Sequence, residues 1–298
     1  MIIKAKTKQL ILQALKEDIG AADITTDALI SKKQSGKFII IAKQPCVICG
    51  IALAEACFQA LDNSVYFRPM VNDATAVESG KVIAHIEGSA KSILMAERTT
   101  LNFLGWLSGV STLTNKFVEK VTPYSVDIMD TRKTIPTFRH LQKYAVKIGG
   151  GKNHRMGLYD QVLIKDNHIE VTSNGIKEAL EKAKRYAPKG KKIEIEVKNL
   201  TELKEALNCN PDIIMLDNMK ISDIKEAVKL RNSYRIKQQD IGFKTLIEVS
   251  GNITLENVAD VAACGIERIS IGALTHSAPA ADFSLSVAEP FPRQARDG

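Results

Sequence analysis

Aromatic side chains are scarce in this sequence, at 5% of 298 residues, which argues against a surface for nucleic acid. Proteins that bind single strands stack successive bases on aromatic rings. The formal net charge of +7 would otherwise suggest such a partner. That charge is concentrated, because eight Lys and Arg accompany only three Asp between Asp130 and His168. We therefore expect a local cationic site for a small, strongly anionic ligand and no nucleic-acid partner.

Long apolar runs and a cysteine framework are also missing. The longest apolar segments contain charges, and residues 1–18 lack the apolar core and cleavage site of a signal peptide. We therefore expect a cytoplasmic protein that does not bind a membrane. Cys46 and Cys49 form a CxxC without a second pair nearby. Buried reduced thiols are a better interpretation of this motif than a zinc site.

The apolar pattern changes along the chain and predicts two domains. A helix at 4–18 and strands at KFIIIA, VYFRPMV and KVIAHIEG indicate a mixed first domain. A helical pattern over 90–121, with a break expected near Ser108 and Gly109, leads into the second. From residue 125, six short apolar runs alternate with helices expected at 137–148, 174–187, 200–208, 221–231 and 254–263. This alternation predicts an α/β barrel of about six parallel strands, closed or nearly closed.

Polar residues or glycine end nearly every one of these six apolar runs. They are Asp130 to Lys133 after the first run, Lys165 after the second, Glu194 and Glu196 in the third, Asp217 after the fourth, Ser250, Gly251 and Asn252 after the fifth, and Gly272 after the sixth. The C-terminal ends of barrel strands converge on one mouth, where catalytic groups gather. We therefore predict an active site at this end of the strands.

The residue types at this mouth suit a phosphorylated sugar and an anionic partner. Arg132, Lys133, Arg155 and Lys165 can bind carboxylate or phosphate. Glu196 and Asp217, on neighbouring strands if the order is sequential, suit a hydrated Mg²⁺ or a cation developing on a sugar carbon. The backbone N–H groups that follow the last two strands suit a phosphate.

Several single residues stay ambiguous at this level. Glu194 shares a strand face with Glu196, so the pattern alone cannot separate the two. His154 is equally a structural or a functional histidine. The GGGK at 149–152 does not have the glycine spacing of a phosphate-binding Walker A loop. Arg139, Lys143 and Lys147 recur at helical spacing, which predicts a solvated helix face.

A series of ordered motifs resembles the quinolinate phosphoribosyltransferase family, also called nicotinate-nucleotide pyrophosphorylase (carboxylating), of the type II phosphoribosyltransferases. They are DTRKT at 130–134, KYAVKIGGGKNHRMGLYDQVLIKDNH at 143–168, EIEVKNL at 194–200, MLDNM at 215–219, IEVSGNI at 247–253 and ISIGALTHS at 269–277. EDIGAADITTDAL at 17–29 and AERTTLNFLGWLSGVST at 96–112 extend the match over nearly the whole chain.

The resemblance implies a pentosyltransferase of NAD biosynthesis, which converts quinolinate and phosphoribosyl pyrophosphate to nicotinate mononucleotide, pyrophosphate and CO₂ with Mg²⁺. It also implies an N-terminal α/β sandwich over residues 1–110, to which 276–298 return, and a barrel over 111–275. A homodimer or higher homo-oligomer follows, because Arg98 matches an arginine that reaches a neighbouring subunit's site.

The same resemblance assigns roles to individual residues. Quinolinate would be held by Arg132, His154, Arg155 and Lys165, and the phosphoribosyl donor by Lys133. Thr131 would also bind substrate. Glu196 matches the catalytic glutamate and would act with Asp217 and Lys133. The carboxylates of Glu196 and Asp217 would also bind the metal, through water or diphosphate. Ser250, Gly251, Asn252, Ser270, Gly272 and Ala273 would surround the 5′-phosphate.

Some positions depart from the family pattern. Ile135 and Thr137 replace Thr and Gly after DTRKT, Ala22 replaces a Gly, and Lys198 stands where Glu is frequent. None of these changes removes a charged site residue, so they affect loop shape. A related transferase acting on nicotinate or nicotinamide is the main alternative, but such ligands would need fewer cations. A basic nucleic-acid-binding protein and an inactive homologue that only binds ligand are weaker alternatives.

Overall fold

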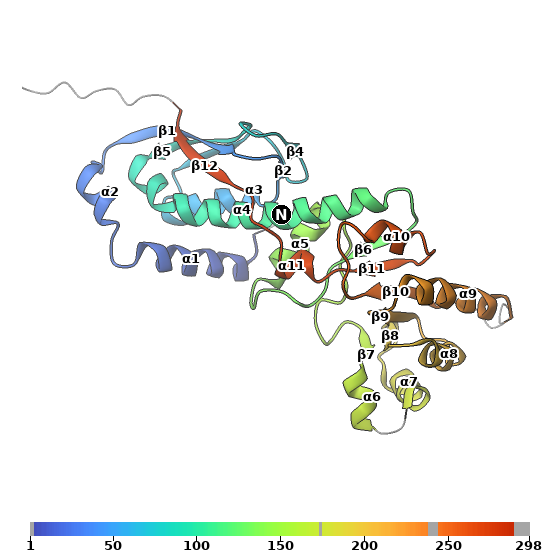
Figure 1. The fold of residues 1–298 in the computed structure, drawn as a ribbon. Coiled ribbons are helices and arrows are strands. Elements are labelled where there is room, and N and C mark those ends of the chain that lie inside the picture. Colours follow the sequence, from blue (N-terminus) through green and yellow to red (C-terminus); the bar gives the residue numbers. More distant parts are fainter. Residues whose placement is uncertain (1–2, 173–174, 238–243, 289–298) are drawn as a thin grey trace, which may run out of the picture. The chain divides into compact units, whose positions relative to one another are not determined.

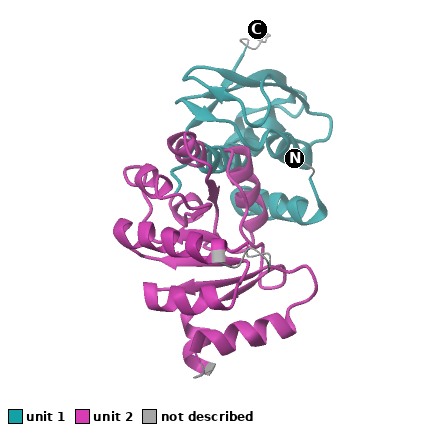
Figure 2. Ribbon diagram, turned by 90° about the vertical axis from the view of Figure 1, so that its right-hand side faces the viewer, with its two compact units in different colours: residues 1–113, 278–298 teal, residues 114–277 magenta. Residues whose placement is uncertain are grey.

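The computed structural model describes residues 3–172, 175–237 and 244–288. The chain divides into two compact units, one of residues 1–113 with 278–298 and the other of residues 114–277 (Figure 2). The division falls inside the helix α4, Ala90–Val121. The family resemblance had suggested a division after residue 110 and a return at residue 276. No helix within the described part of the chain is both long enough and apolar enough to span a membrane.

The first unit is built on an antiparallel sheet with the strand order β12-β1-β5-β3. Its strands are β1 Ser35–Ala42, β3 Tyr66–Pro69, β5 Val82–Ser89 and β12 Phe283–Val287, and a small ribbon pairs β2 Cys46–Val47 with β4 Ala76–Val77. The helices are α1 Ala5–Ile19, α2 Ile24–Leu29, α3 Ile51–Leu61 and α4. Phe38, Ile40 and Ala42 alternate along β1 and are buried, so one face of the sheet belongs to the core. The predicted helix and strands of this half are confirmed.

The break predicted in α4 is wrong, because the helix continues from Ala90 to Val121. Its glycines serve close packing instead. A Cβ atom at Gly109 would lie 2.0 Å from the carbonyl oxygen of Pro279, and one at Gly105 would lie 2.5 Å from that of Ala281. The returning C-terminal segment therefore runs against a glycine surface of α4 in the first unit.

The CxxC residues lie in this unit, and both thiols are buried. Burial raises the pKa of the Cys46 thiol to about 11. A thiol in such surroundings is neutral at neutral pH and behaves as a small apolar side chain.

The second unit contains a parallel sheet of six strands in the order β6-β11-β10-β9-β8-β7 (Figure 1). The strands are β6 Asp127–Met129, β7 Val162–Ile164, β8 Ile193–Val197, β9 Ile213–Asp217, β10 Leu246–Ser250 and β11 Arg268–Ser270. The predicted α/β architecture with six parallel strands is confirmed. Among the described residues no backbone pairing joins the edge strands β6 and β7, so hydrogen bonds do not close the barrel. Lys152 instead forms a parallel bridge with Met129 on the edge of β6.

Helices connect these strands much as the apolar pattern predicts. They are α5 Arg139–Ile148, α6 Asp166–Thr172, α7 Gly175–Tyr186, α8 Leu200–Asn208, α9 Ile221–Lys237, α10 Val258–Ala262 and α11 Ala273–His276. The short helices α6 and α11 were not predicted, α9 is longer than expected and α10 is shorter. The first residue of the predicted helix 174–187 lies outside the described residues. Asn199 begins α8 and its side chain accepts from the N–H groups of Thr201 and Glu202, as N-cap residues do.

Replacing Gly109 by Ala tests the packing role of the α4 glycines. Alanine normally stabilises a helix interior by about 1 kcal/mol relative to glycine. Here the new methyl group meets the Pro279 carbonyl, and such overpacking costs about 1–3 kcal/mol or more. We expect Gly109→Ala to lower the free energy of unfolding in urea. The exposed Asn102→Ala change in the same helix should alter it by less than about 0.5 kcal/mol. A stabilised Gly109→Ala variant would contradict the packing explanation.

Candidate active site

The predicted site residues follow the strands at one edge of the parallel sheet. In the strand register, Ser270 pairs with Met129 and Ser250, and Ser250 pairs with Asp217. The C-terminal ends of β6, β11, β10 and β9 are therefore level with one another. Residues that follow these strands leave the sheet at one end, as expected for a site at the mouth of an α/β barrel.

Asp130, directly after β6, is fully buried and organises the start of the site. Its carboxylate accepts hydrogen bonds from the Lys143 ammonium, the Asn153 side-chain amide (2.5 Å) and the His154 backbone N–H (2.9 Å). Lys143 also donates to the His154 carbonyl oxygen at 3.0 Å. Burial raises the pKa of Asp130 and lowers that of Lys143, and their mutual attraction opposes both shifts. This ion pair joins β6, α5 and the loop before β7.

Lys143 corrects the predicted solvated face of α5. It is fully buried, whereas Lys147, one turn further, is exposed. Arg139 is half-buried and donates to the Thr134 hydroxyl at 2.9 Å and the Met156 carbonyl at 3.0 Å. The three basic residues have helical spacing, but the strand end that α5 covers carries the Asp130 carboxylate. The buried Asp130 carboxylate therefore holds Lys143, one residue of this basic face, inside the protein.

The triple glycine allows the chain to leave α5 and return to β6. Gly150 adopts φ +90°, which favours glycine, and a Cβ atom at Gly151 would lie 2.8 Å from side-chain atoms of Thr114 and Val146. Lys152 then bridges to β6, with its N–H donating to the Ile128 carbonyl at 2.7 Å. The prediction that these glycines permit a sharp turn is confirmed. The turn delivers residues 153–155 to the end of β6.

Cationic side chains meet just beyond this turn. Arg155 is buried, and its guanidinium donates to the Gln161 carbonyl at 3.2 Å. Burial lowers the pKa of Arg155, and the neighbouring positive charge of Arg132 lowers it further. The Nε atom of Arg132 is buried and donates to no residue within the described ranges. Two guanidinium groups whose charges influence one another favour an anionic ligand nearby.

The structure separates the two glutamates that the sequence pattern left equivalent. Both lie on β8, where every residue is buried. The Glu196 carboxylate lies 2.5 Å from the Lys165 ammonium, which follows the neighbouring strand β7. The Glu194 carboxylate instead accepts from the Gln161 amide and lies 3.0 Å from His154 Nε2. Only Glu196 therefore has the half-exposed cation Lys165 as its partner.

A third buried glutamate, Glu248 on β10, was not singled out from the sequence. Its Oε1 lies 3.5 Å from His154 Nε2, and its Oε2 lies 3.8 Å from the Arg268 guanidinium. The other nitrogen of His154, Nδ1, accepts from the Arg155 backbone N–H at 2.8 Å. Both ring nitrogens thus face groups of the protein, so a direct contact of His154 with a ligand stays a prediction.

Asp217 ends β9 beside the loop that follows β10. The Asn218 amide donates to the Asp217 carboxylate at 2.9 Å, and the Asn252 amide donates to Asn218 Oδ1 at 2.9 Å. Gly251 has φ +95°, and a Cβ atom there would lie 2.1 Å from Asn218 Oδ1. The SGN segment at 250–252 therefore packs against the end of β9, which brings it beside Asp217.

The remaining predicted contacts of a phosphoribosyl ligand lie around the ends of β6 and β11. The Thr131 hydroxyl accepts from the Lys133 N–H at 3.1 Å, and the Thr275 hydroxyl donates to the Lys133 carbonyl at 2.8 Å. A Cβ atom at Gly272 would lie 3.2 Å from the Lys133 side chain. Lys133 therefore lies against Gly272, and Ala273 begins α11 at the same place. Ser270, at the end of β11, is buried.

Arg98 stands apart from this set in the chain. It is exposed on the part of α4 that belongs to the first unit. The other predicted site residues, from Thr131 to Ala273, all belong to the second unit. A role for Arg98 at a neighbouring subunit's site stays a prediction.

The residues missed from the sequence are Asp130, Lys143, Gln161 and Glu248 as supports of the site. One signal was available for Glu248, because it is a charged residue inside the apolar run TLIEVS, as Glu194 is inside KIEIEV. Buried charges are rare unless they are paired. A carboxylate inside an apolar run therefore predicts a partner, although the run does not identify it.

Comparison with known proteins assigns both parts of the chain. The family descriptions "Quinolinate phosphoribosyl transferase, N-terminal domain" and "C-terminal domain" match residues 23–108 and 110–286. A probable nicotinate-nucleotide pyrophosphorylase (carboxylating) of Methanocaldococcus jannaschii is 43% identical over 96% of this chain and 99% of its own length. One of Bacillus subtilis is 38% identical over 94% and 93%. The solved nicotinate-nucleotide pyrophosphorylase of Francisella tularensis superposes with a TM-score of 0.87 at 39% identity, over 95% and 96% of the two chains.

Replacing Asp130 by Asn tests the central ion pair. The change leaves the Lys143 ammonium buried without its countercharge, which typically costs about 3–5 kcal/mol. We expect this loss in the free energy of unfolding measured by urea titration. The matched control is Lys152→Met, which breaks a solvent-exposed pair with Asp127 and should cost about 1 kcal/mol at most. Equal effects of the two changes would show that Asp130 has no special structural role.

Proposed function

The chain belongs to the quinolinate phosphoribosyltransferase family, and from that premise we propose that it transfers phosphoribosyl from phosphoribosyl pyrophosphate to quinolinate. The products are nicotinate mononucleotide, pyrophosphate and CO₂, and the reaction serves NAD biosynthesis. The chain is thus a pentosyltransferase, a nicotinate-nucleotide pyrophosphorylase (carboxylating).

The observation that best supports this function is that several cations and the two carboxylates of Glu196 and Asp217 all lie at the C-terminal end of the parallel strands. The positive charge of Arg132 acts on Arg155, and Lys165, which follows β7, pairs with Glu196 on the neighbouring strand β8. Quinolinate carries two carboxylates, and planar guanidinium groups bind carboxylates with two parallel hydrogen bonds. The buried, unpaired Nε of Arg132 gives such a ligand a donor that the protein itself leaves unused.

The phosphoribosyl donor binds near the residues that follow β6, β10 and β11, at the same C-terminal end of the strands. Lys133 and Thr131 contact the donor, Ser250, Gly251 and Asn252 hold the 5′-phosphate, and so do the groups from Ser270 to Ala273. The close packing of Lys133 on Gly272 supports this arrangement, because it brings the stem of this cationic side chain beside the N-terminus of α11. Glycine at 272 leaves the backbone open to a phosphate, since a side chain there would meet Lys133 and His276.

Mg²⁺ is the proposed cofactor, and the oxygen ligands present fit it. Glu196 and Asp217 lie on adjacent strands, and Asp217 is partly exposed. Hard carboxylate oxygens suit Mg²⁺, which keeps much of its water shell and bridges to substrate phosphates. The ion would be held by these two carboxylates through water or diphosphate, and it would neutralise charge on the departing pyrophosphate.

The chain's own residues then act on the sugar and on the pyridine ring. Departure of pyrophosphate leaves a ribose carbon with oxocarbenium character, and the negative charges of Glu196 and Asp217 stabilise it. The ring nitrogen of quinolinate attacks this carbon. The resulting pyridinium accepts the electron pair of the adjacent carbon–carboxylate bond as CO₂ leaves, and that carbon takes up a proton. Lys165, paired with Glu196, changes partner when a ligand carboxylate arrives.

We also propose a homodimer or a higher homo-oligomer of cytoplasmic location. Its basis is Arg98 in the AERT motif, an exposed residue of the first unit that matches the family's arginine donated to a neighbouring subunit. The guanidinium reaches a neighbouring subunit's quinolinate.

A product assay tests the proposed function. Incubation with quinolinate, phosphoribosyl pyrophosphate and Mg²⁺ should give nicotinate mononucleotide and CO₂ in equal amounts, measured by chromatography and by release of labelled carboxyl carbon. Glu196→Gln should lower kcat by about 10²–10³, because it removes a charge aimed at the transition state while leaving the cations that bind quinolinate. The matched control, Glu205→Gln, changes an exposed glutamate on α8 and should retain full activity.

Two outcomes would contradict the proposal. Absence of nicotinate mononucleotide with the wild-type protein would reject the function itself. Full activity of Glu196→Gln would reject the assigned role of Glu196 and leave the function standing.

A further inference from the structure

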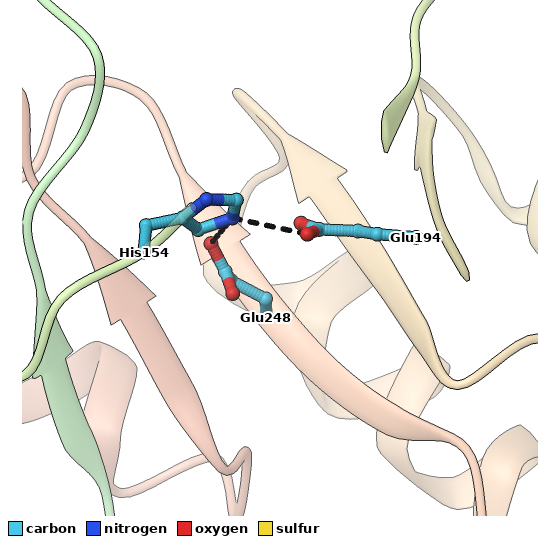
Figure 3. Close-up of side chains that lie close together, drawn as sticks. All are labelled: His154, Glu194 and Glu248. Atoms are coloured by element: carbon cyan, nitrogen blue, oxygen red, sulfur yellow. Dashed lines mark ion pairs between the residues drawn. The ribbon is translucent and has the colours of Figure 1, made fainter. Parts of the chain in front are cut away.

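Three buried side chains from separate segments meet behind the cationic site. His154 comes from the loop after α5, Glu194 from β8 and Glu248 from β10, and Figure 3 shows the imidazole pointing at both carboxylates. His154 Nε2 lies 3.0 Å from Glu194 Oε2 and 3.5 Å from Glu248 Oε1. Both carboxylates have no exposed surface. The function proposed above uses neither Glu194 nor Glu248 directly.

Two carboxylates so close and so deeply buried do not both carry a full negative charge without compensation. Neither carboxylate oxygen of Glu248 has a hydrogen-bond partner of good geometry within the described ranges. The nearby Ser270 hydroxyl lowers the pKa of Glu248, which favours the ionised form. Burial and the negative charge of Glu194 raise the pKa of Glu248 to about 7. Glu248 is therefore a buried acid that changes charge near neutral pH.

His154 is the natural partner for the same proton. Burial by itself would lower the pKa of His154, but the hydrogen bond and charge of Glu194 and the charge of Glu248 outweigh it, so the net shift is upward. The positive charge of Lys143 opposes this upward shift. Among the described residues, the charged groups that act on the pair include Glu194 on β8, Arg268 on β11 and Lys143 on α5, and Arg155 at the mouth acts on Glu194.

The same donor set resembles a metal site, since one imidazole and two carboxylates offer ligand atoms within 4.8 Å of one another. Its surroundings favour a proton instead. The Gln161 amide already donates to Glu194 Oε2, and the Arg268 guanidinium faces Glu248. Lys143 and Arg155 add further positive charge nearby. A divalent cation would face all of these groups, whereas one proton relieves the repulsion between the carboxylates.

We propose that Glu248 and His154 form a buried proton store, and that binding of dianionic quinolinate at the adjacent cations drives uptake of one proton from solvent onto this pair. The inference rests on the function proposed above. A negative charge brought close to an acid raises its pKa, so a partly protonated pair gains protons when the dianion arrives. The proton moves from water or buffer to the Glu248 carboxylate or the imidazole, and no other bond changes.

Proton uptake matches a requirement of the proposed chemistry. When CO₂ leaves the pyridinium ring, the electron pair stays on a ring carbon that ends with a hydrogen. One proton must therefore reach this ring carbon. Glu248 and His154 act as positioning and charge-balancing residues, and a proton gained on binding is held within the protein before that step.

Isothermal titration of quinolinate into the full-length protein, without phosphoribosyl pyrophosphate, measures this uptake. Titrations in buffers of different ionisation enthalpy give the number of protons bound per site from the slope of the observed heat. A dicarboxylate is fully ionised at these pH values. With a free Glu248 pKa of about 7, uptake should be largest just above pH 7 and should fall away below about pH 6, where the pair is already protonated.

Glu248→Gln is the decisive variant, because glutamine keeps the shape and cannot titrate. We expect it to bind quinolinate with the proton uptake reduced to less than half of the wild-type value. The matched control is Glu226→Gln, a half-exposed glutamate on α9, which should leave uptake unchanged. If Glu248→Gln does not fold, the pH dependence of the wild-type uptake still decides.

The outcomes separate the inference from the function on which it rests. Failure of the wild-type protein to bind quinolinate would reject the proposed function. Binding and turnover without any buffer dependence, or equal uptake in Glu248→Gln, would overturn the proton store alone. Saturable binding of Mn²⁺ or Zn²⁺ to the metal-stripped protein, abolished by Glu248→Gln, would also overturn it and identify a metal site.

Discussion

One buried carboxylate, that of Asp130, determines the geometry of the candidate site. It ends β6, neutralises Lys143 from α5, and holds the backbone of His154 and the side chain of Asn153. A buried ion pair contributes little net stability, but removing one partner is costly. Replacing Asp130 or Lys143 alone should therefore cost more stability than replacing residues around the pair. Arg132 follows Asp130 by two residues and Arg155 follows His154, so the contacts of Asp130 join the two segments that carry these arginines.

The rest of the site follows from placing charges of opposite sign on neighbouring strand ends. Glu196 faces the cation Lys165 near the mouth, where a ligand can reach it. Glu194, two residues earlier on the same strand, lies deeper and faces His154 and Glu248. Depth thus divides the carboxylates by role. The outer ones suit chemistry at the sugar, and the inner ones set the charge on the histidine behind the cations.

Sequence patterns predicted the helices and strands of this molecule better than they predicted which side chains contact one another. Alternating strands and helices gave the parallel sheet, and the run of polar strand ends indicated one functional edge. Period-2 spacing could not separate Glu194 from Glu196, because their partners come from other strands. Lys143 was predicted to be solvated, because helical spacing does not show which face meets a buried carboxylate. Gly109 was read as a break, since only tertiary packing reveals the carbonyl beside it.

The claim that the cations bind a dianion is tested most directly by comparing two substrates. Quinolinate and nicotinate differ by one carboxylate, and a hydrogen bond to a charged group contributes about 1.5–3 kcal/mol, or about 10- to 100-fold. The measurement is kcat/KM for each, with phosphoribosyl pyrophosphate and Mg²⁺ held constant. We predict that kcat/KM is about 10- to 100-fold higher for quinolinate than for nicotinate. Equal use of the two, or a preference for nicotinate, would contradict the account of Arg132, Arg155 and Lys165.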